Sequence, residues 1–314
     1  MIKQIALPAV LLVGLCETAS TRGQAPVEPP FVLRQVGPSV FAAIHNPNAK
    51  EPSYANAGFV IGDDGVAVID TFANSGAATH LLSEIRRRTK LPVKFVVNTH
   101  HHPDHVAGNR IFANAGATVI AHVNVRRWIH AENLRLLGDA PRPELKTFVE
   151  SLTAPTVVYA DAMTLHLGAR EILVRSYPGH TGGDSVVVIP DASVAFGGDL
   201  LWQNAVPNMV DASARVWMET LDAMAKNGAG FTFVPGHGDI GTASEVLAFR
   251  DYLATLNKLV ADARMQGRSG KALSDAVLPA LGAKYGGWGL FKDLAPLNIE
   301  HMEAELAGKK RVPQ

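Results

Sequence analysis

Residues 99–105 read Thr99-His100-His101-His102-Pro103-Asp104-His105, and this stretch decides how the whole chain is interpreted. It follows residues 93–97, an apolar run that predicts a buried strand. Successive side chains of an extended segment point to opposite faces, so we expect His100 and His102 to share one face and His101 to point away from them. Four histidines and an aspartate within six positions are typical of a metal site.

Three later segments each place a histidine or an aspartate at the end of an expected strand. They are Tyr177-Pro178-Gly179-His180-Thr181, Phe196-Gly197-Gly198-Asp199 and Pro235-Gly236-His237-Gly238. Glycine allows the backbone to turn sharply and to approach a metal closely. Imidazole and carboxylate ligands without thiolate suit zinc, although iron and manganese also accept them. The sequence therefore predicts a metal centre assembled from four separate segments.

The ordered set HxHxDH, GHT, GGD and PGHG resembles the metallo-β-lactamase superfamily over roughly residues 31–241. The resemblance implies an α/β fold, a four-layer αβ/βα sandwich with the metals at one edge between two sheets. It also implies two Zn²⁺ per chain, the first held by His100, His102 and His180, the second by Asp104, His105 and His237, and both bridged by Asp199. Oxygen-reducing di-iron members of the family carry glutamate at the position of His102, so the histidine favours a hydrolase.

The same resemblance implies a zinc-dependent hydrolase in which a metal-bridging hydroxide attacks an amide or ester carbonyl. Asp104 is the expected catalytic residue, because it can orient the nucleophile. β-Lactamase-like activity on cyclic amides is the leading expectation. However, the best-known β-lactamase subclass has cysteine at the position of Asp199 and lysine at that of Trp202. A lactonase, thioesterase or other ester hydrolase is therefore the alternative, and a periplasmic metal-binding protein without turnover is the second alternative.

Residues around the ligands also carry expectations. Metal-bound histidines usually donate their second nitrogen to a neighbour, and Asp70, Thr99 and Asp239 are candidates for that role. Aromatic and polar residues near a metal cleft often contact the substrate. The expected substrate-facing residues are Tyr54, Trp202, Asn204 and Asn208, with ordinary core packing as the alternative for the aromatic ones.

Short apolar runs and turn residues predict the elements. Strands are expected at residues 31–36, 40–44, 58–61, 66–69, 93–97, 156–159, 172–176, 185–189, 194–196 and 232–234. Helices are expected at 77–88 with Ser75 as the cap, and at 216–226, 244–267 and 271–278. Runs of strands followed by helices predict two sheets packed face to face with helices outside. We expect residues 26–314 to form one domain, with a helical insertion at about 123–152 and a C-terminal helical extension at about 242–306.

The N-terminus and the composition restrict location and partners. A basic Lys3, an apolar run and small residues before Ala25 predict a signal peptide at residues 1–25. We therefore expect a secreted or periplasmic protein without stable membrane insertion after cleavage; the only cysteine, Cys16, lies in that segment. The 29 basic and 29 acidic residues give no net charge, which argues against a nucleic-acid partner and leaves a small-molecule substrate. The sequence leaves the oligomeric state open.

Overall fold

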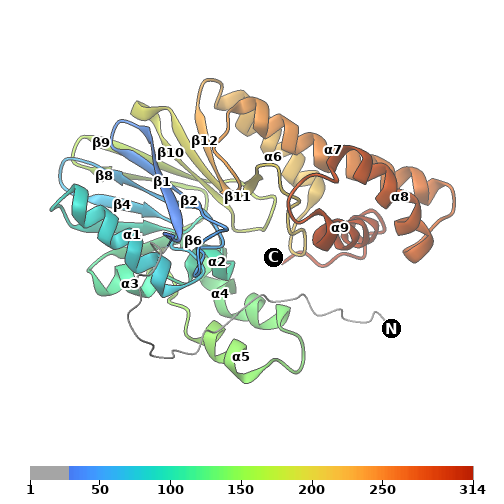
Figure 1. Ribbon diagram of the computed structural model, residues 1–314, viewed down its shortest axis with the longest axis horizontal. Helices are drawn as coiled ribbons and strands as arrows, with labels where there is room; N and C mark the ends of the chain where they lie inside the picture. The colour runs from blue at the N-terminus through green and yellow to red at the C-terminus, as the bar shows by residue number, and fades with distance from the viewer. Residues whose placement is uncertain (1–27, 314) are drawn as a thin grey trace, which may run out of the picture.

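A computed structural model describes residues 28–313, and their strands form two sheets (Figure 1). The predicted signal peptide lies outside the described residues. One sheet has seven strands in chain order: β1 (Phe31–Gly37), β2 (Val40–His45), β3 (Ala57–Ile61), β4 (Val66–Ile69), β5 (Val93–Val97), β6 (Thr118–His122) and β7 (Val157–Tyr159). The other has five, in the order β12 (Thr232–His237), β11 (Val194–Trp202), β10 (Ser185–Ile189), β9 (Arg170–Ser176) and β8 (Ala162–Leu167).

Helices cover the outer faces of both sheets. α1 (Ser75–Arg88) and α3 (Asn109–Asn114) pack on the seven-stranded sheet, and α6 (Ala214–Asn227) and α7 (Ala243–Met265) pack on the five-stranded one. The remaining helices are α2 (Pro103–Val106), α4 (Val123–Leu136), α5 (Pro143–Glu150), α8 (Gly270–Tyr285) and α9 (Phe291–Leu306), with a 3-10 turn at Pro190–Ala192. The order helix, sheet, sheet, helix confirms the predicted four-layer α/β sandwich.

The alternation of side chains along buried strands produces this layering. In β4, Ala67 and Ile69 join the core between the two sheets, whereas Val66 and Val68 join the core under α1. All four residues are buried, because this central strand is covered on both faces. Each sheet thus contributes one face to a shared core and one face to a helical layer.

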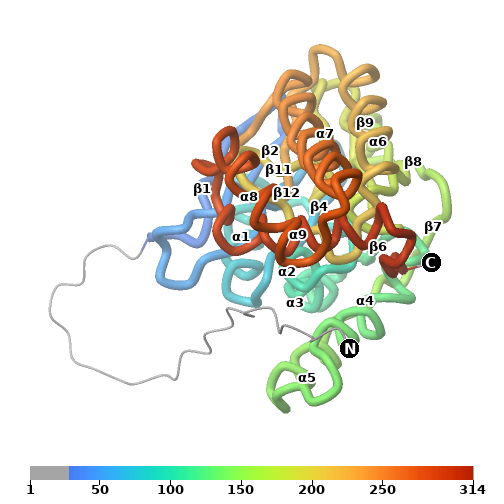
Figure 2. The backbone as a smooth tube through the Cα atoms, turned by 90° about the vertical axis from the view of Figure 1, so that its right-hand side faces the viewer, coloured from blue at the N-terminus to red at the C-terminus, as the bar shows by residue number. Residues whose placement is uncertain are grey.

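Two helical regions extend beyond the sandwich. α4 and α5 project together from the seven-stranded side (Figure 2), and α8 and α9 pack on α7 at the right of Figure 1. The end of the described chain returns from α9 towards α4 in both views. Among residues 28–313, none of the helices has the length and apolarity needed to cross a membrane.

Several expected boundaries were wrong. Asn74, and not Ser75, caps α1, because its side-chain oxygen accepts a hydrogen bond from the Ala77 amide at 2.8 Å. β11 does not end at Phe196 but runs on to Trp202, since parallel pairing with β12 resumes beyond the glycines after a register shift. β8 was absent from the list of expected strands, α9 lies within the expected helical extension without having been given bounds of its own, and α8 continues to Tyr285 through an internal Pro279.

Candidate metal centre

The structure brings all seven predicted ligands to one edge of the sandwich, between the sheets. The seven-stranded sheet supplies the loop after β5, with His100 and His102, and the short helix α2, with Asp104 and His105. The five-stranded sheet supplies His180 after β9, Asp199 within β11 and His237 at the end of β12. Neither sheet alone carries a complete set of ligands.

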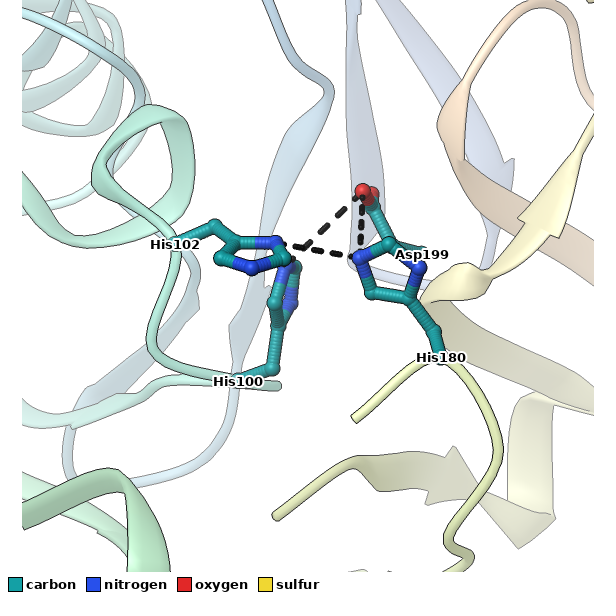
Figure 3. A group of neighbouring side chains, drawn as sticks. All are labelled: His100, His102, His180 and Asp199. Carbon is teal, nitrogen blue, oxygen red and sulfur yellow. Dashed lines mark hydrogen bonds and ion pairs between the residues drawn. The ribbon is translucent and has the colours of Figure 1, made fainter. Parts of the chain in front are cut away.

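His100, His102 and His180 form the first group, which we call the three-histidine group. Nδ1 of His102 lies 3.1 Å from Nε2 of His100 and 3.0 Å from Nε2 of His180. Figure 3 shows the rings of His102 and His180 facing each other, with His100 below them and the carboxylate of Asp199 above. All three side chains are buried, so these nitrogens converge in a region closed to solvent.

Asp104, His105 and His237 form the second group, which we call the Asp104 group. Oδ2 of Asp104 lies 3.3 Å from Nε2 of His237 and 3.6 Å from Nε2 of His105. The side chain of Asp104 is 29% exposed and that of His237 is 16% exposed, whereas His105 is fully buried. This group therefore lies nearer to the solvent than the three-histidine group.

Asp199 lies between the two groups. Its Oδ2 is 3.4 Å from Nε2 of His180 and 3.8 Å from Nε2 of His100. Its Oδ1 is 2.9 Å from Nε2 of His105 and 3.2 Å from Nε2 of His237. Each oxygen of one buried carboxylate thus faces a different group, which is the arrangement of a bridging ligand.

The donor atoms fit zinc. Tetrahedral zinc holds nitrogen at about 2.0–2.1 Å, which places two such ligand atoms about 3.3 Å apart. The separations within both groups lie close to this value. Within residues 28–313, Nε2 of His105, Nε2 of His237 and Oδ1 of Asp199 are buried without a hydrogen-bond partner. Buried polar atoms normally have partners, so these three match the need for metal coordination.

Main-chain hydrogen bonds hold the histidine-rich loop in place. The amide of Thr71 donates to the carbonyl of His105 at 2.8 Å, and the amide of Ser185 donates to the carbonyl of Thr99 at 2.9 Å. The side chain of Asn133 donates to the carbonyl of His101 at 2.9 Å. The loop is thereby tied to β4, to β10 and to α4 at once.

Asp70 and Thr99 orient two of the ligands. Oδ2 of Asp70 lies 2.9 Å from Nδ1 of His105, and the hydroxyl of Thr99 donates to the same oxygen at 2.7 Å. That hydroxyl also lies 3.1 Å from Nδ1 of His100. Asp70 reaches this place from a left-handed backbone with a φ of 57°, which a short polar side chain tolerates. Both residues occupy the places expected for ligand-orienting groups.

Two glycines allow close packing at the centre, one against the carboxylate of Asp199 and the other against the hydroxyl of Thr99. A Cβ atom on Gly236 would lie 2.0 Å from Oδ1 of Asp199, and one on Gly198 would lie 2.3 Å from the Thr99 hydroxyl. Gly198 also has a φ of 50°. The glycines of GGD and PGHG therefore allow the close approach that the sequence predicted.

Trp202 is placed differently from the expectation. Its side chain is 4% exposed, and its ring stacks on His237 with centroids 3.9 Å apart and planes at 20°. The expectation of a substrate-facing residue was wrong and the alternative, core packing, holds, because β11 continues through Trp202 and turns it inward. Trp202 therefore supports the ligand His237 from behind. Trp217, in α6, similarly packs against His180 at a centroid distance of 5.3 Å.

The other expected contact residues divide into two cases. Tyr54 is 38% exposed, and its ring stacks on that of His45. The pKa of His45 is lowered by burial and by the nearby His237. Tyr54 thus lies on the side of the Asp104 group. Asn204 is exposed, and its carbonyl accepts from Gly289. Asn208 is half-buried and accepts from the amide of Val210 at 3.0 Å. Within residues 28–313, neither asparagine makes a hydrogen bond to a predicted ligand.

Asp239 does not orient a metal ligand, and that expectation was wrong. Its side chain is exposed and pairs with Arg34. The chain turns at Gly238, which has a φ of 88°, and this turn directs the next side chain outward.

Asp211, by contrast, was not singled out from the sequence. It lies in the loop between β11 and α6, completely buried, with Oδ2 3.4 Å from Nε2 of His102 and 3.7 Å from Nε2 of His101. His101 belongs to neither group of ligands, and it is buried against Trp128, Asp211 and the ring of His102, whose centroid is 4.6 Å away. No histidine, glycine or strand-end pattern marks Val210-Asp211-Ala212, so the sequence offered no local signal.

Burial and charge shift the pKa values of the histidines in opposite directions in the two groups, with the exception of His102, whose pKa is raised by Asp211 against the effect of burial. Burial lowers the pKa of His180 to about 3 and holds that of His100 well below its usual value. Burial also acts to lower the pKa of His237, but Asp199 and Asp104 outweigh it and raise the pKa to about 9. The same two carboxylates raise the pKa of His105 against the effect of burial.

The chain is similar to known proteins over the segment that contains the predicted ligands. The family model described as the Metallo-beta-lactamase superfamily matches residues 51–237, more than half of the chain and a range that contains all seven residues. A hydroxyacylglutathione hydrolase of Mesorhizobium japonicum is 27% identical over 158 residues, which cover 50% of this chain and 52% of that protein. The chain therefore spans about half the length of that relative.

A second relative and two solved structures are metallo-beta-lactamases. The metallo-beta-lactamase IND-1 of Chryseobacterium indologenes is 24% identical over 190 residues, covering 59% of this chain and 72% of that protein. A metallo-beta-lactamase from Pontibacter korlensis superposes with a TM-score of 0.59 at 23% identity, covering 71% of this chain and 99% of the other. The DIM-1 metallo-beta-lactamase superposes with a TM-score of 0.58 at 19% identity, covering 74% of this chain and 99% of the other. At these identities the structural likeness shows the fold.

Proposed function

Because this chain belongs to the metallo-β-lactamase superfamily, we propose that it is a dinuclear zinc hydrolase that cleaves an amide or ester carbonyl. The observation that carries the proposal is the position of Asp199, with one oxygen towards each group of ligands. A shared carboxylate keeps two metal ions at a fixed separation. Metal pairs roughly 3.5–4 Å apart are the arrangement used by many hydrolytic enzymes.

The seven side chains would each have a defined task. His100, His102 and His180 would hold one ion, Asp104, His105 and His237 the other, and Asp199 both. When bound, a zinc pair supplies a nucleophilic hydroxide at neutral pH and polarises the carbonyl oxygen of the substrate. No cysteine lies within residues 28–313, so all donors are nitrogen or oxygen.

Asp104 is the proposed catalytic residue. It is more exposed than any of the other six side chains, so it is the one that faces an incoming substrate and water. Burial acts to raise its pKa, but His105 and His237 lower it to about 2. The carboxylate is therefore ionised at neutral pH and can accept a hydrogen bond from the attacking nucleophile, which orients it.

Aromatic side chains close the rear of the centre. Trp202 stacks on His237, and Trp217 packs against His180 and donates its indole N–H to the carbonyl of Leu200 at 3.0 Å. Apolar walls of this kind exclude water from behind the ligands and strengthen the electrostatic interactions in front of them. The open side, at Asp104, is left for substrate.

We propose two classes of substrate, given in the order in which they should be tested. β-Lactamase-like activity on cyclic amides comes first, because IND-1 is among the relatives and the fold is shared with solved lactamases. Hydrolysis of a thioester or lactone comes second, because the hydroxyacylglutathione hydrolase is also a relative. Asp199 supports the second class, since it stands where the best-known lactamases carry cysteine, whereas Trp202 matches neither the lysine of those lactamases nor the tyrosine of lactonases.

A panel of substrates tests the proposal. Purified zinc-loaded protein is mixed with a chromogenic β-lactam, a lactone and a thioester, and Asp199→Ala serves as the matched inactive control. We expect at least one substrate to be hydrolysed, with loss of activity on chelation and recovery with zinc. Two bound zinc ions without turnover of any substrate would instead favour a metal-binding protein.

We also propose that the protein is exported to the periplasm or beyond. The support is the signal-like sequence of residues 1–25, which lie outside the described residues. N-terminal sequencing of protein from its native host should find a start between about Thr21 and Pro26. Intact Met1 on cytoplasmic material would contradict export.

A further inference from the structure

Asp211 is a buried carboxylate to which the seven-ligand scheme gives no role. Its side chain is completely buried, and its two oxygens face different partners. Oδ2 lies 3.4 Å from Nε2 of His102, and Oδ1 accepts a hydrogen bond from the Arg135 guanidinium at 2.6 Å. A buried charge is costly unless it is paired, so both contacts matter for keeping Asp211 ionised.

His102 connects Asp211 to the three-histidine group. Its Nδ1 faces His100 and His180, while its Nε2 faces Asp211 on the other side of the ring. An imidazole that binds a metal through one nitrogen carries its proton on the other, and a carboxylate that accepts this proton fixes both tautomer and ring orientation. His105 has the same arrangement with Asp70 in the other group.

We propose that Asp211 is a positioning residue for His102: it accepts the Nε2–H hydrogen bond and holds Nδ1 towards the metal. The inference rests on the proposed metal centre. It adds to the seven ligands an eighth residue, which does not bind metal and which positions only the three-histidine group. Each group then has its own orienting carboxylate, Asp70 on one side and Asp211 on the other.

A third metal ion is the competing explanation, because His101, His102 and Asp211 also lie close enough to share one. The neighbouring cation argues against it. Arg135 already occupies the second oxygen of Asp211 at 2.6 Å, so a metal ion there would face a guanidinium across a buried carboxylate. With Arg135 and His102 as partners, Asp211 is satisfied as a hydrogen-bond acceptor.

The segment after α9 holds the Asp211 loop from outside. Lys310 donates from Nζ to the carbonyls of Met209, at 2.7 Å, and Ala212, which flank Asp211 on either side. Arg311 makes two hydrogen bonds of 2.7 Å to the carboxylate of Glu132, which in turn pairs with Arg135. The end of the described chain lies between α9 and α4 (Figures 1 and 2), as these contacts require.

The test is a zinc titration of metal-free protein against a chromophoric chelator, for the unaltered chain and for Asp211→Asn. The amide keeps the shape but loses the charge that polarises His102. We expect one of the two zinc sites to weaken by roughly 10–100-fold, the usual cost of losing an orienting partner, while the other keeps its affinity. The absorption spectrum of bound Co²⁺ should change for the same site. Asp251→Asn, a remote carboxylate paired with Lys284, is the control and should change neither.

A second pair of variants keeps the inference testable if Asp211→Asn does not fold. Arg311→Met should weaken the same zinc site, by less than Asp211→Asn, whereas Lys309→Met, at an exposed neighbour, should have no effect. Equal affinities for Arg311→Met and Lys309→Met would then overturn the inference.

The outcomes separate this inference from the proposed function. Wild-type affinity and spectrum in Asp211→Asn would overturn the positioning role and leave the metal centre intact. Equal weakening of both sites, with a lower melting temperature of the metal-free variant, would also overturn it, because it would mean general structural damage. Absence of zinc binding by the unaltered chain would overturn the metal centre itself, and this inference with it.

Discussion

The three-histidine group and the Asp104 group lie on opposite sides of one carboxylate, yet they differ in charge and exposure. In the three-histidine group, burial keeps His100 and His180 neutral, with lowered pKa values. In the Asp104 group, carboxylates raise the pKa values of His105 and His237. The metal-free protein therefore holds two neutral histidines, His100 and His180, in the first group, where only His102 has a raised pKa, because Asp211 faces it. The second group consists of ion pairs.

This difference shows how one protein can prepare two unlike groups of ligands around a shared carboxylate, with their ring nitrogens 2.9–3.8 Å from the oxygens of Asp199. The neutral imidazoles of His100 and His180 can bind a cation without first releasing a proton. They bring no charge to the metal ion. The Asp104 group must first release protons, but it brings the negative charge of Asp104 and is open to solvent. We infer that substrate approaches the centre from the side of the second group, which is the more exposed of the two.

Removal of Asp199 should have the largest effect, because it breaks the link between the groups. We expect Asp199→Ala to lower kcat by at least about 100-fold, the scale seen when electrostatic positioning at a reacting centre is lost. Steady-state kinetics on the substrate found in the panel measure this, and Asp239→Ala, at an exposed residue, is the control. Wild-type turnover by Asp199→Ala would show that the ligand assignment is wrong.

Removal of Asp70 should affect one group more than the other. In Asp70→Asn, the asparagine tolerates the left-handed backbone at this position, but the negative charge that faces His105 is lost. We expect zinc affinity at the Asp104 group to fall by roughly 10–100-fold. The three-histidine group should weaken less, because Asp70 reaches His100 only through Thr99. Competition titration measures both sites, and equal loss at both would remove the distinction between them.

Loss of the Trp202 ring should have the smallest effect. Its stacking on His237 is worth about 0.5–1.5 kcal/mol, so Trp202→Leu should weaken zinc at the Asp104 group by roughly two- to tenfold. The control is Trp288→Leu, which removes a similar stacking contact with Tyr252 among the C-terminal helices. If Trp288→Leu weakened zinc as much as Trp202→Leu, the effect of Trp202 would be one of general stability.

Local patterns in the sequence predicted the two packed sheets and the histidine-rich loop, and the resemblance to a known superfamily implied which seven residues would meet at the centre. The alternation in Val66–Ile69 and the spacing from His100 to His105 are visible without tertiary structure. Asp211 was missed because it meets His102 across 109 positions, through a loop with no pattern of its own. Trp202 and Asp239 were misplaced for a related reason. Their directions depend on the continuation of β11 and on the turn at Gly238, which pairing with β12 and backbone conformation decide.

The most direct test of the central claim is a calorimetric zinc titration of the metal-free protein at pH 7, repeated in buffers of different ionisation heat. The claim predicts two zinc ions per chain. The Asp104 group should release about two protons, from His105 and His237, and its affinity should rise with pH towards about 9. The three-histidine group should release no more than about one, from His102, whose pKa is raised by Asp211 against the effect of burial. A single zinc ion per chain, or equal proton release in both steps, would contradict the account.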